Sequence, residues 1–306
     1  MRRMKTRRAT KWTTTFLTLL ALLALLACIT ACSPSDLPAL TSTSNPPTST
    51  PRPTFIPSST ADPSTANPTR PACLSRPGRV DSGTVDSTEP PQEYLIYLPP
   101  CYDEQTYQRY PVLYLLHGQT YTADQWIRLG AVDALDKLIL SGKASPFIIV
   151  FPNDRYWYTE TGSGFGDRVA DALIPFIDDH YRTNPNREQR AIGGMSRGAG
   201  WALRLGLSHW DQFSIIGLHS LAIFQGDASR IEKWLTNIPA SSYPVIFMDI
   251  GDNDPELANA RKAESLFNDH GLSHEWHLYS GAHTEEYWRA HVQEYIAWYA
   301  TQWTHP

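Results

Sequence analysis

The sequence of 306 residues predicts an α/β fold, with one mostly parallel sheet of about eight strands flanked by helices. Short β-rich runs alternate with helical segments over residues 78–303. The strand runs are continuously apolar, which is typical of strands covered on both faces. In the helical segment 167–181, Val169, Leu173, Phe176 and Ile177 recur at helical spacing. The predicted elements leave no room for a large lid.

The predicted elements alternate regularly. An opening pair of strands is expected at residues 78–87 and 93–100, and further strands at residues 109–118, 146–153, 189–196, 213–220, 243–254 and 274–283. Helices are expected at residues 123–141, 167–181, 197–209, 228–237, 255–270 and 284–303. In such a sheet, ligands bind at the carboxyl ends of the strands, so the loops after each strand are the places to search for function.

The first 32 residues are predicted to be an export signal with a lipobox. Six cations and no acid precede an apolar run at residues 16–27, which is a signal-peptide layout. The run is shorter than the about 20 apolar residues that a membrane-spanning helix needs. The stretch ending at Cys32 resembles a bacterial lipobox, and cleavage there discards Cys28 and leaves an even number of other cysteines. We expect lipid on Cys32 and a place in the bacterial cell envelope; Cys28, or an ordinary secretory signal, is the alternative.

The mature chain is predicted to contain a linker and one domain. Residues 33–77 are rich in Ser, Thr and Pro and lack apolar periodicity, so we expect a disordered linker. Residues 78–306 form the domain. Cys73 and Cys101 are expected to form a disulfide, because an exported protein meets oxidising conditions; two unpaired thiols are the alternative.

The motif most informative about function is Gly194-Met195-Ser196-Arg197-Gly198, which follows a predicted strand and begins a predicted helix. A G-x-S-x-G motif in this setting is typical of a nucleophile elbow, in which the serine occupies a strained turn. Side chains at Gly194 and Gly198 would clash with neighbouring backbone. We predict that Ser196 is a nucleophile; a plain strand-to-helix turn is the alternative.

A nucleophilic serine needs a base and an acid, which follow it in the order acid, then histidine, in this kind of fold. Asp254 and His283 each follow a predicted strand in that order. Asp254 is the preferred acid and Asp252 the second choice. Asp249, at the end of its strand, is more typical of a structural carboxylate that caps local amides.

The predicted oxyanion hole lies where the buried strand 109–118 ends. The backbone N–H groups of Gln119 and Arg197 are the expected donors, each contributing about 3 kcal/mol of transition-state stabilisation. His117 is expected to hold this loop by hydrogen bonds.

With these motifs in place, residues 78–303 resemble the esterase D family of α/β-hydrolases, which includes S-formylglutathione hydrolase, feruloyl, acetylxylan and enterochelin esterases, and the antigen 85 mycolyltransferases. The similar stretches are YLIYLPPCYD, RYPVLYLLHG, FIDDHYRT, AIGGMSRGAGWALRLGL, GDNDP and YSGAHTEEYW. The resemblance implies an α/β-hydrolase fold, a triad of Ser196, Asp254 and His283, and a serine carboxylic-ester hydrolase acting through an acyl-enzyme. Carbohydrate-linked, phenolic or siderophore esters are the implied substrates. An acyltransferase of the same fold is the alternative, and a non-catalytic binding lipoprotein is a further one.

One departure from the family concerns residues 197–199, which read Arg-Gly-Ala where many relatives have Met-Gly-Gly. The departure places a cation beside the expected oxyanion hole, where it could alter substrate preference.

The remaining predictions concern ligands and partners. Trp126, Tyr156, Trp157 and Trp288 are expected to line a substrate pocket, with packing as the alternative. No metal or cofactor is expected, because the two histidines of the stretch HEWH fall on opposite faces of a strand. The net charge of −5 argues against nucleic acid as a partner.

Overall fold

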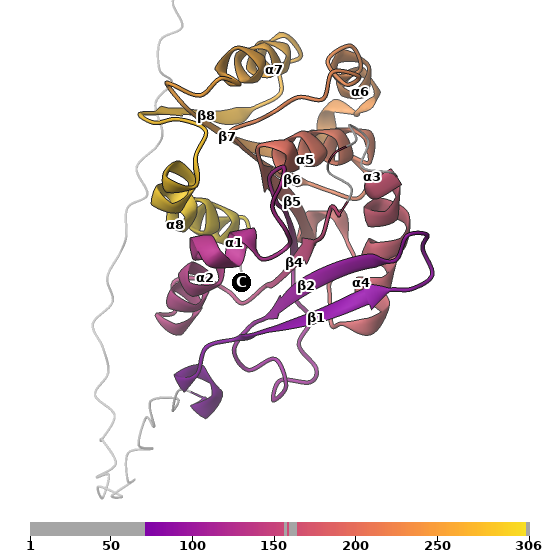
Figure 1. The fold of residues 1–306 in the computed structure, drawn as a ribbon. Coiled ribbons are helices and arrows are strands. Elements are labelled where there is room, and N and C mark those ends of the chain that lie inside the picture. The colour runs from indigo at the N-terminus through magenta and orange to yellow at the C-terminus, as the bar shows by residue number, and fades with distance from the viewer. Residues whose placement is uncertain (1–70, 156–157, 159–163, 304–306) are drawn as a thin grey trace, which may run out of the picture. The chain divides into compact units, whose positions relative to one another are not determined.

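Eight strands form one sheet, and each lies where the sequence predicts it (Figure 1). The computed structural model describes residues 71–155, 158 and 164–303. The order across the sheet is β1 (Arg79–Val85), β2 (Gln92–Leu98), β4 (Ile148–Pro152), β3 (Val112–Leu116), β5 (Arg190–Met195), β6 (Ile215–His219), β7 (Val245–Gly251) and β8 (His274–Tyr279). Only the β1–β2 and β2–β4 pairs are antiparallel. The predicted mostly parallel sheet is confirmed.

The central strands are buried on both faces, which explains their unbroken apolar sequences. Every residue of β3, β4, β5 and β6 is buried. Along β3, Val112, Tyr114 and Leu116 belong to one core cluster and Leu113 and Leu115 to another. Alternate side chains of a strand point to opposite faces, so the sheet separates two apolar cores.

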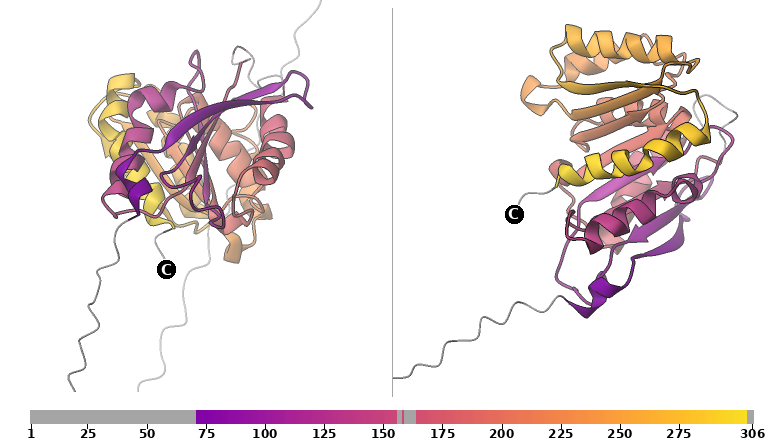
Figure 2. Two further views of the ribbon diagram at one scale, coloured as in Figure 1. Left: turned by 90° about the horizontal axis from the view of Figure 1, so that it is seen from below. Right: turned by 90° about the vertical axis from the view of Figure 1, so that its left-hand side faces the viewer.

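The helices cover these two faces (Figure 2). One core holds side chains from α1 (Gln125–Leu129), α2 (Ala131–Leu140) and α8 (Glu285–Thr301). The other core holds side chains from six further helical elements, namely α3 (Phe165–Asp167), the π-helical segment η3 (Arg168–Leu173), α4 (Ile174–His180), α5 (Arg197–Ser208), α6 (Ile231–Asn237) and α7 (Leu257–Asp269).

Two predicted helices are interrupted. The helix expected at residues 123–141 breaks at Gly130, whose φ of 104° lies in the left-handed region that glycine adopts without steric cost. The helix expected at residues 167–181 contains the π-helical segment η3 just before Pro175. Proline has no backbone N–H to donate within a helix, which explains a change between π-helical and α-helical hydrogen bonding close to Pro175.

The register of the parallel strands aligns their carboxyl ends. Gly194 of β5 lies opposite Leu116 of β3 and Leu218 of β6. The residues that follow these strands, among them His117, Ser196 and Ser220, therefore emerge at the same edge of the sheet.

The predicted disulfide joins Cys73 to Cys101. Cys73 lies in a short 3-10 turn, η1 (Ala72–Ser75). Residues 71–77, which the sequence assigns to the linker, lie among the described residues and include this turn. The predicted signal, Cys32 and linker residues 33–70 lie outside the described residues. No helix in the described part of the chain is both long and apolar enough to span a membrane.

Replacing Cys73 and Cys101 together by alanine is expected to lower the free energy of unfolding by about 3.5 kcal/mol, because the bridge closes a loop of 28 residues. Urea denaturation of the oxidised protein and the variant measures the difference. The reduced wild-type chain should match the variant, and equal stability of oxidised and reduced protein would contradict the prediction.

Candidate active site

Ser196 occupies a strained turn between β5 and α5. Its φ of 54° and ψ of −122° are rarely adopted by residues with a side chain. A Cβ atom on Gly194 would lie 2.2 Å from the carbonyl carbon of Gly198, and one on Gly198 would lie 2.2 Å from the carbonyl oxygen of Leu116. The predicted clashes at both glycines are therefore present, and the turn requires glycine at each position.

The backbone of Ser196 is held at both of its polar groups. Its N–H donates to the carbonyl of His219 at 2.9 Å, and its carbonyl accepts from the N–H of Gly200 at 3.1 Å. The turn is thus anchored to the end of the neighbouring strand β6 and to the first turn of α5.

The structure brings together the three side chains that the sequence selects. Ser196 Oγ lies 2.7 Å from His283 Nε2, and His283 Nδ1 lies 2.8 Å from Asp254 Oδ2 and 3.0 Å from Asp254 Oδ1. Asp254 follows β7 and His283 follows β8. A hydroxyl bound to an imidazole, itself oriented by a carboxylate, can transfer its proton and act as a nucleophile.

Asp254 is suited to remain ionised although its side chain is fully buried. Burial alone raises the pKa of this carboxyl, but hydrogen bonds from His283 and from the N–H of Glu256 outweigh burial and hold its pKa below the usual 3.8. The Glu256 N–H lies 2.8 Å from Oδ1. Ser220 adds a further hydrogen bond that favours the charged form.

The two rival acids have other partners. Asp252 is exposed, and its Oδ1 accepts from the N–H of Gly281 at 3.0 Å, which ties together the loops after β7 and β8. Asp249 is buried and is structural, as expected, but its side chain accepts from side chains and not from local amides. Its donors are His219 Nδ1 at 2.6 Å, the Tyr287 hydroxyl at 2.7 Å and the Tyr295 hydroxyl at 2.6 Å.

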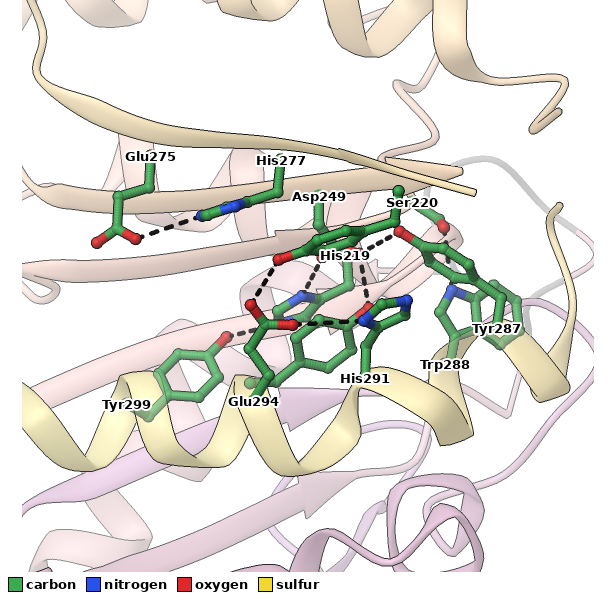
Figure 3. A network of polar contacts seen from close by, with 12 residues as sticks. His219, Ser220, Asp249, Glu275, His277, Tyr287, Trp288, His291, Glu294 and Tyr299 are labelled. Atoms are coloured by element: carbon green, nitrogen blue, oxygen red, sulfur yellow. Dashed lines mark hydrogen bonds and ion pairs between the residues drawn. The ribbon is translucent and has the colours of Figure 1, made fainter. Parts of the chain in front are cut away.

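Figure 3 shows the buried network around Asp249, which joins α8 to β6 and β7. Burial raises the pKa of Tyr287 and of Tyr295 above the usual range, so both hydroxyls stay protonated and can donate to the carboxylate. His219 Nε2 also lies 3.2 Å from the hydroxyl of Tyr299. Sequence reasoning missed this network, although spacings of eight and four residues place the three tyrosines on one face of the helix.

Replacing Asp249 by alanine is expected to lower the free energy of unfolding by about 3–5 kcal/mol, because three buried donors lose their acceptor. Denaturant unfolding measures the effect. Asp252→Ala is the matched control, since it removes an exposed carboxylate three residues away and should cost about 1 kcal/mol or less. Similar losses in the two variants would refute the structural role of Asp249.

The predicted aromatic pocket is not supported at the two tryptophans that the structure describes. Trp126 has no exposed surface, and its Nε1 donates to the carbonyl of Leu116 at 2.9 Å; it belongs to the core. Trp288 is also buried, donates from Nε1 to Ser220 Oγ at 3.0 Å, and packs edge-on against the ring of His283 at 5.1 Å. Trp288 therefore supports the histidine. Tyr156 and Trp157 lie outside the described residues.

A cavity of about 440 Å³ opens beside Ser196 and His283. Both predicted oxyanion residues border it, and so does a segment after β6 that the sequence did not single out. The lining residues are Gln119, Ser196, Arg197, Ala222, Ile223, Phe224, Gln225, Glu256 and His283. A second cavity of about 600 Å³, lined by residues of α6 and α7, shares Ile223, Phe224 and Gln225 with the first but is lined by neither Ser196 nor His283.

The loop carrying Gln119 is fixed from both sides. The N–H of Gly118 donates to Gln125 Oε1 at 2.8 Å. His117 Nδ1 lies 2.8 Å from the Gly118 carbonyl, and its Nε2 accepts from the N–H of Asp154 at 2.9 Å. Burial lowers the pKa of His117, in keeping with a neutral ring that donates at one nitrogen and accepts at the other. His117 holds the loop, as expected from the sequence.

The cation predicted beside the oxyanion hole has a buried counter-ion. Arg197 Nε lies 2.9 Å from Asp154 Oδ2, and both side chains are buried. Trp201 Nε1 donates to the same oxygen at 3.1 Å. The guanidinium also lies 5.1 Å from the centre of the Phe224 ring. Asp154 therefore compensates the charge of Arg197.

Within residues 71–155, 158 and 164–303, no group of three or more His, Cys, Asp or Glu side chains is arranged to hold a metal ion.

Two proteins of similar sequence carry the name esterase. An endo-1,4-beta-xylanase/feruloyl esterase of Xylanibacter ruminicola is 31% identical over 212 residues, which cover 62% of this chain and 28% of that protein. An esterase of Mycobacterium tuberculosis is 33% identical over 138 residues, which cover 41% of this chain and 28% of that protein. The chain thus matches less than a third of the length of either relative.

Solved structures share the fold. A ferulic acid esterase superposes with a TM-score of 0.66 and 25% identity, covering 74% of this chain and 100% of that one. The feruloyl esterase module of Clostridium thermocellum, complexed with sinapinate, gives a TM-score of 0.64 at 18% identity, covering 78% of this chain and 94% of that one. Both are α/β-hydrolase esterases.

The family model described as "Putative esterase" matches residues 86–299, which include all but the first of the eight strands and nearly all of α8. The chain therefore belongs to this esterase family of α/β-hydrolases.

Proposed function

We propose that this protein hydrolyses carboxylic esters through a Ser-His-Asp triad and an acyl-enzyme. The observation that carries the proposal is the continuous set of contacts from Ser196 Oγ to His283 at 2.7 Å and from His283 to Asp254 at 2.8 Å. The esterase relatives support the same reaction class.

In the proposed reaction, His283 accepts the hydroxyl proton of Ser196 while Oγ attacks the ester carbonyl. Asp254 orients the imidazole and stabilises its charged form. The backbone N–H groups of Gln119 and Arg197, two residues that border the cavity, would stabilise the negative oxygen of the tetrahedral intermediate. His283 then protonates the leaving alcohol, and a water molecule, activated by the same histidine, releases the acid from Ser196.

For the substrate, we propose esters of phenolic acids, including those linked to carbohydrate. Solved structures of the same fold have been obtained with sinapinate and with ferulic acid bound. Among the described residues, the ring of Phe224 and several polar groups line the cavity beside Ser196, a composition that suits an aromatic acid joined to a polar alcohol.

We also propose that a lipid on Cys32 holds this domain in the cell envelope through a Ser/Thr/Pro-rich linker. The disulfide between Cys73 and Cys101 agrees with an oxidising compartment. Labelling cells with a clickable fatty acid should mark the wild-type chain and not a Cys32→Ser variant, and equal labelling of the two would refute the assignment.

Rapid mixing with 4-nitrophenyl acetate tests the central proposal. We expect a burst of one nitrophenolate per chain, followed by steady turnover, because with this activated ester the acyl-enzyme forms faster than water resolves it. A fluorophosphonate should block the burst and, by peptide mass spectrometry, label Ser196. Labelling elsewhere, or no burst and no turnover, would exclude the mechanism. An acyltransferase would instead give mainly transfer product when an acceptor alcohol or sugar is added.

A further inference from the structure

Two charged side chains of the described residues border the cavity beside Ser196, and they differ in whether a side chain of opposite charge lies next to them. Apart from His283, the ionisable side chains of the described residues that line it are Arg197 and Glu256. Arg197 is paired with the buried carboxylate of Asp154 at 2.9 Å. For Glu256, no cationic side chain of the described residues comes within the 4.0 Å of an ion pair.

Glu256 is held in place at the entrance to α7. Its backbone N–H donates to Asp254 Oδ1 at 2.8 Å, so the residue is attached directly to the proposed triad acid. Its side chain is half-buried, and Oε2 accepts from Asn259 Nδ2 at 2.9 Å. An amide donor orients a carboxylate and leaves its charge in place.

The cations of α7 do not cancel this charge inside the cavity. Arg261 and Lys262 are both exposed, and neither lines the cavity that contains Ser196. Lys262 lines the adjoining cavity of about 600 Å³. Among the described residues, the cavity that receives the reacting ester thus carries the uncompensated negative charge of Glu256, because Asp154 neutralises Arg197.

We propose that Glu256 makes this site select esters by charge, accepting neutral and cationic substrates and rejecting those with an anionic group near the ester. The proposal rests on the proposed function. The effect is electrostatic: in a partly solvated cavity, a unit charge several ångströms away changes kcat/KM by about 5- to 10-fold.

Two pairs of esters of equal shape test the proposal at neutral pH and low salt. The first pair is 4-nitrophenyl hemisuccinate and 4-nitrophenyl 4-methylpentanoate, in which a carboxylate replaces an isopropyl group on the acyl side. The second is butyrylcholine and 3,3-dimethylbutyl butyrate, in which the charge is positive and lies on the alcohol side. Within each pair, the ratio of kcat/KM values cancels effects of size and of general damage.

Glu256→Gln is expected to change a charged-to-neutral ratio by about 5- to 10-fold, raising it for the hemisuccinate pair or lowering it for the choline pair. The pair that responds identifies the half of the ester that faces Glu256. About 1 M salt should shrink the effect, because the remaining interaction is screened.

Glu264→Gln is the matched control. It makes the same substitution within α7, the helix that follows Glu256, and changes the net charge of the protein equally, but Glu264 does not border the cavity. The proposal is overturned if neither ratio moves more than about twofold in Glu256→Gln, or if Glu264→Gln moves it as much. Failure of the proposed function would look different, because Ser196→Ala would then retain the wild-type rate on the neutral esters.

Discussion

Ser196→Ala should lower kcat/KM for 4-nitrophenyl acetate by at least about 10⁴-fold. The change removes only Oγ, the atom that lies 2.7 Å from His283 Nε2 and that would form the acyl bond. Activity remaining after loss of a nucleophile comes from the oxyanion donors and from substrate binding, so a small residual rate is expected. The burst of nitrophenolate should disappear entirely.

The fold should survive this substitution. Alanine and serine meet a similar steric cost at the φ of 54° found here, and the backbone hydrogen bonds of the turn are kept. Thermal unfolding of the two proteins should therefore agree to within about 1 kcal/mol. A variant with native stability and wild-type activity would remove Ser196 from the mechanism.

Asp254→Asn should lower kcat/KM by about 10⁴-fold. An asparagine cannot stabilise the imidazolium as a carboxylate does, and its NH₂ group favours the tautomer of His283 that cannot accept the serine proton. Asp252→Asn is the matched control, because it changes the second-choice acid and keeps an oxygen for the N–H of Gly281. The control should retain activity to within about threefold. A larger loss in Asp252→Asn than in Asp254→Asn would reverse the assignment of the acid.

The lowered pKa of Asp254 also predicts how stability depends on pH. An unfolded aspartate titrates near 3.8, and the folded one titrates lower. The stabilisation is therefore complete above the unfolded value and is lost as the pH falls through the folded value. Urea denaturation between neutral pH and about pH 3 should show less acid destabilisation in Asp254→Asn than in the wild type. An identical pH dependence of the two proteins would show that Asp254 is not held in its charged form.

Much of the fold could be predicted from the sequence because local patterns decide it. Buried parallel strands require continuous apolar runs, and the eight runs coincide with the eight strands. Ser196 is recognisable for a similar reason, since the steric demands of its turn leave glycine at positions 194 and 198. Asp254 and His283 follow from chain order and from their places after successive strands.

Side-chain partners distant in sequence were not predictable in this way. Trp126 and Phe224 are both buried aromatic residues in loops or helices after central strands, yet Phe224 lines the cavity beside Ser196 and Trp126 does not. The sequence draws attention to Arg197 as a charge beside the site. Only the three-dimensional arrangement shows that Asp154, 43 residues earlier, neutralises it.

The attachment of α8 to Asp249 has a consequence for how the protein is made. Tyr287 and Tyr295 reach the carboxylate from the last helix, whereas His219 reaches it from β6. During synthesis, the ribosome releases β6 and β7 long before these tyrosines. Until α8 arrives, the carboxylate of Asp249 has one of its three side-chain donors, and Trp288 is missing from beside His283. The side chains at the carboxyl edge of the sheet should therefore reach their final arrangement late, when α8 docks.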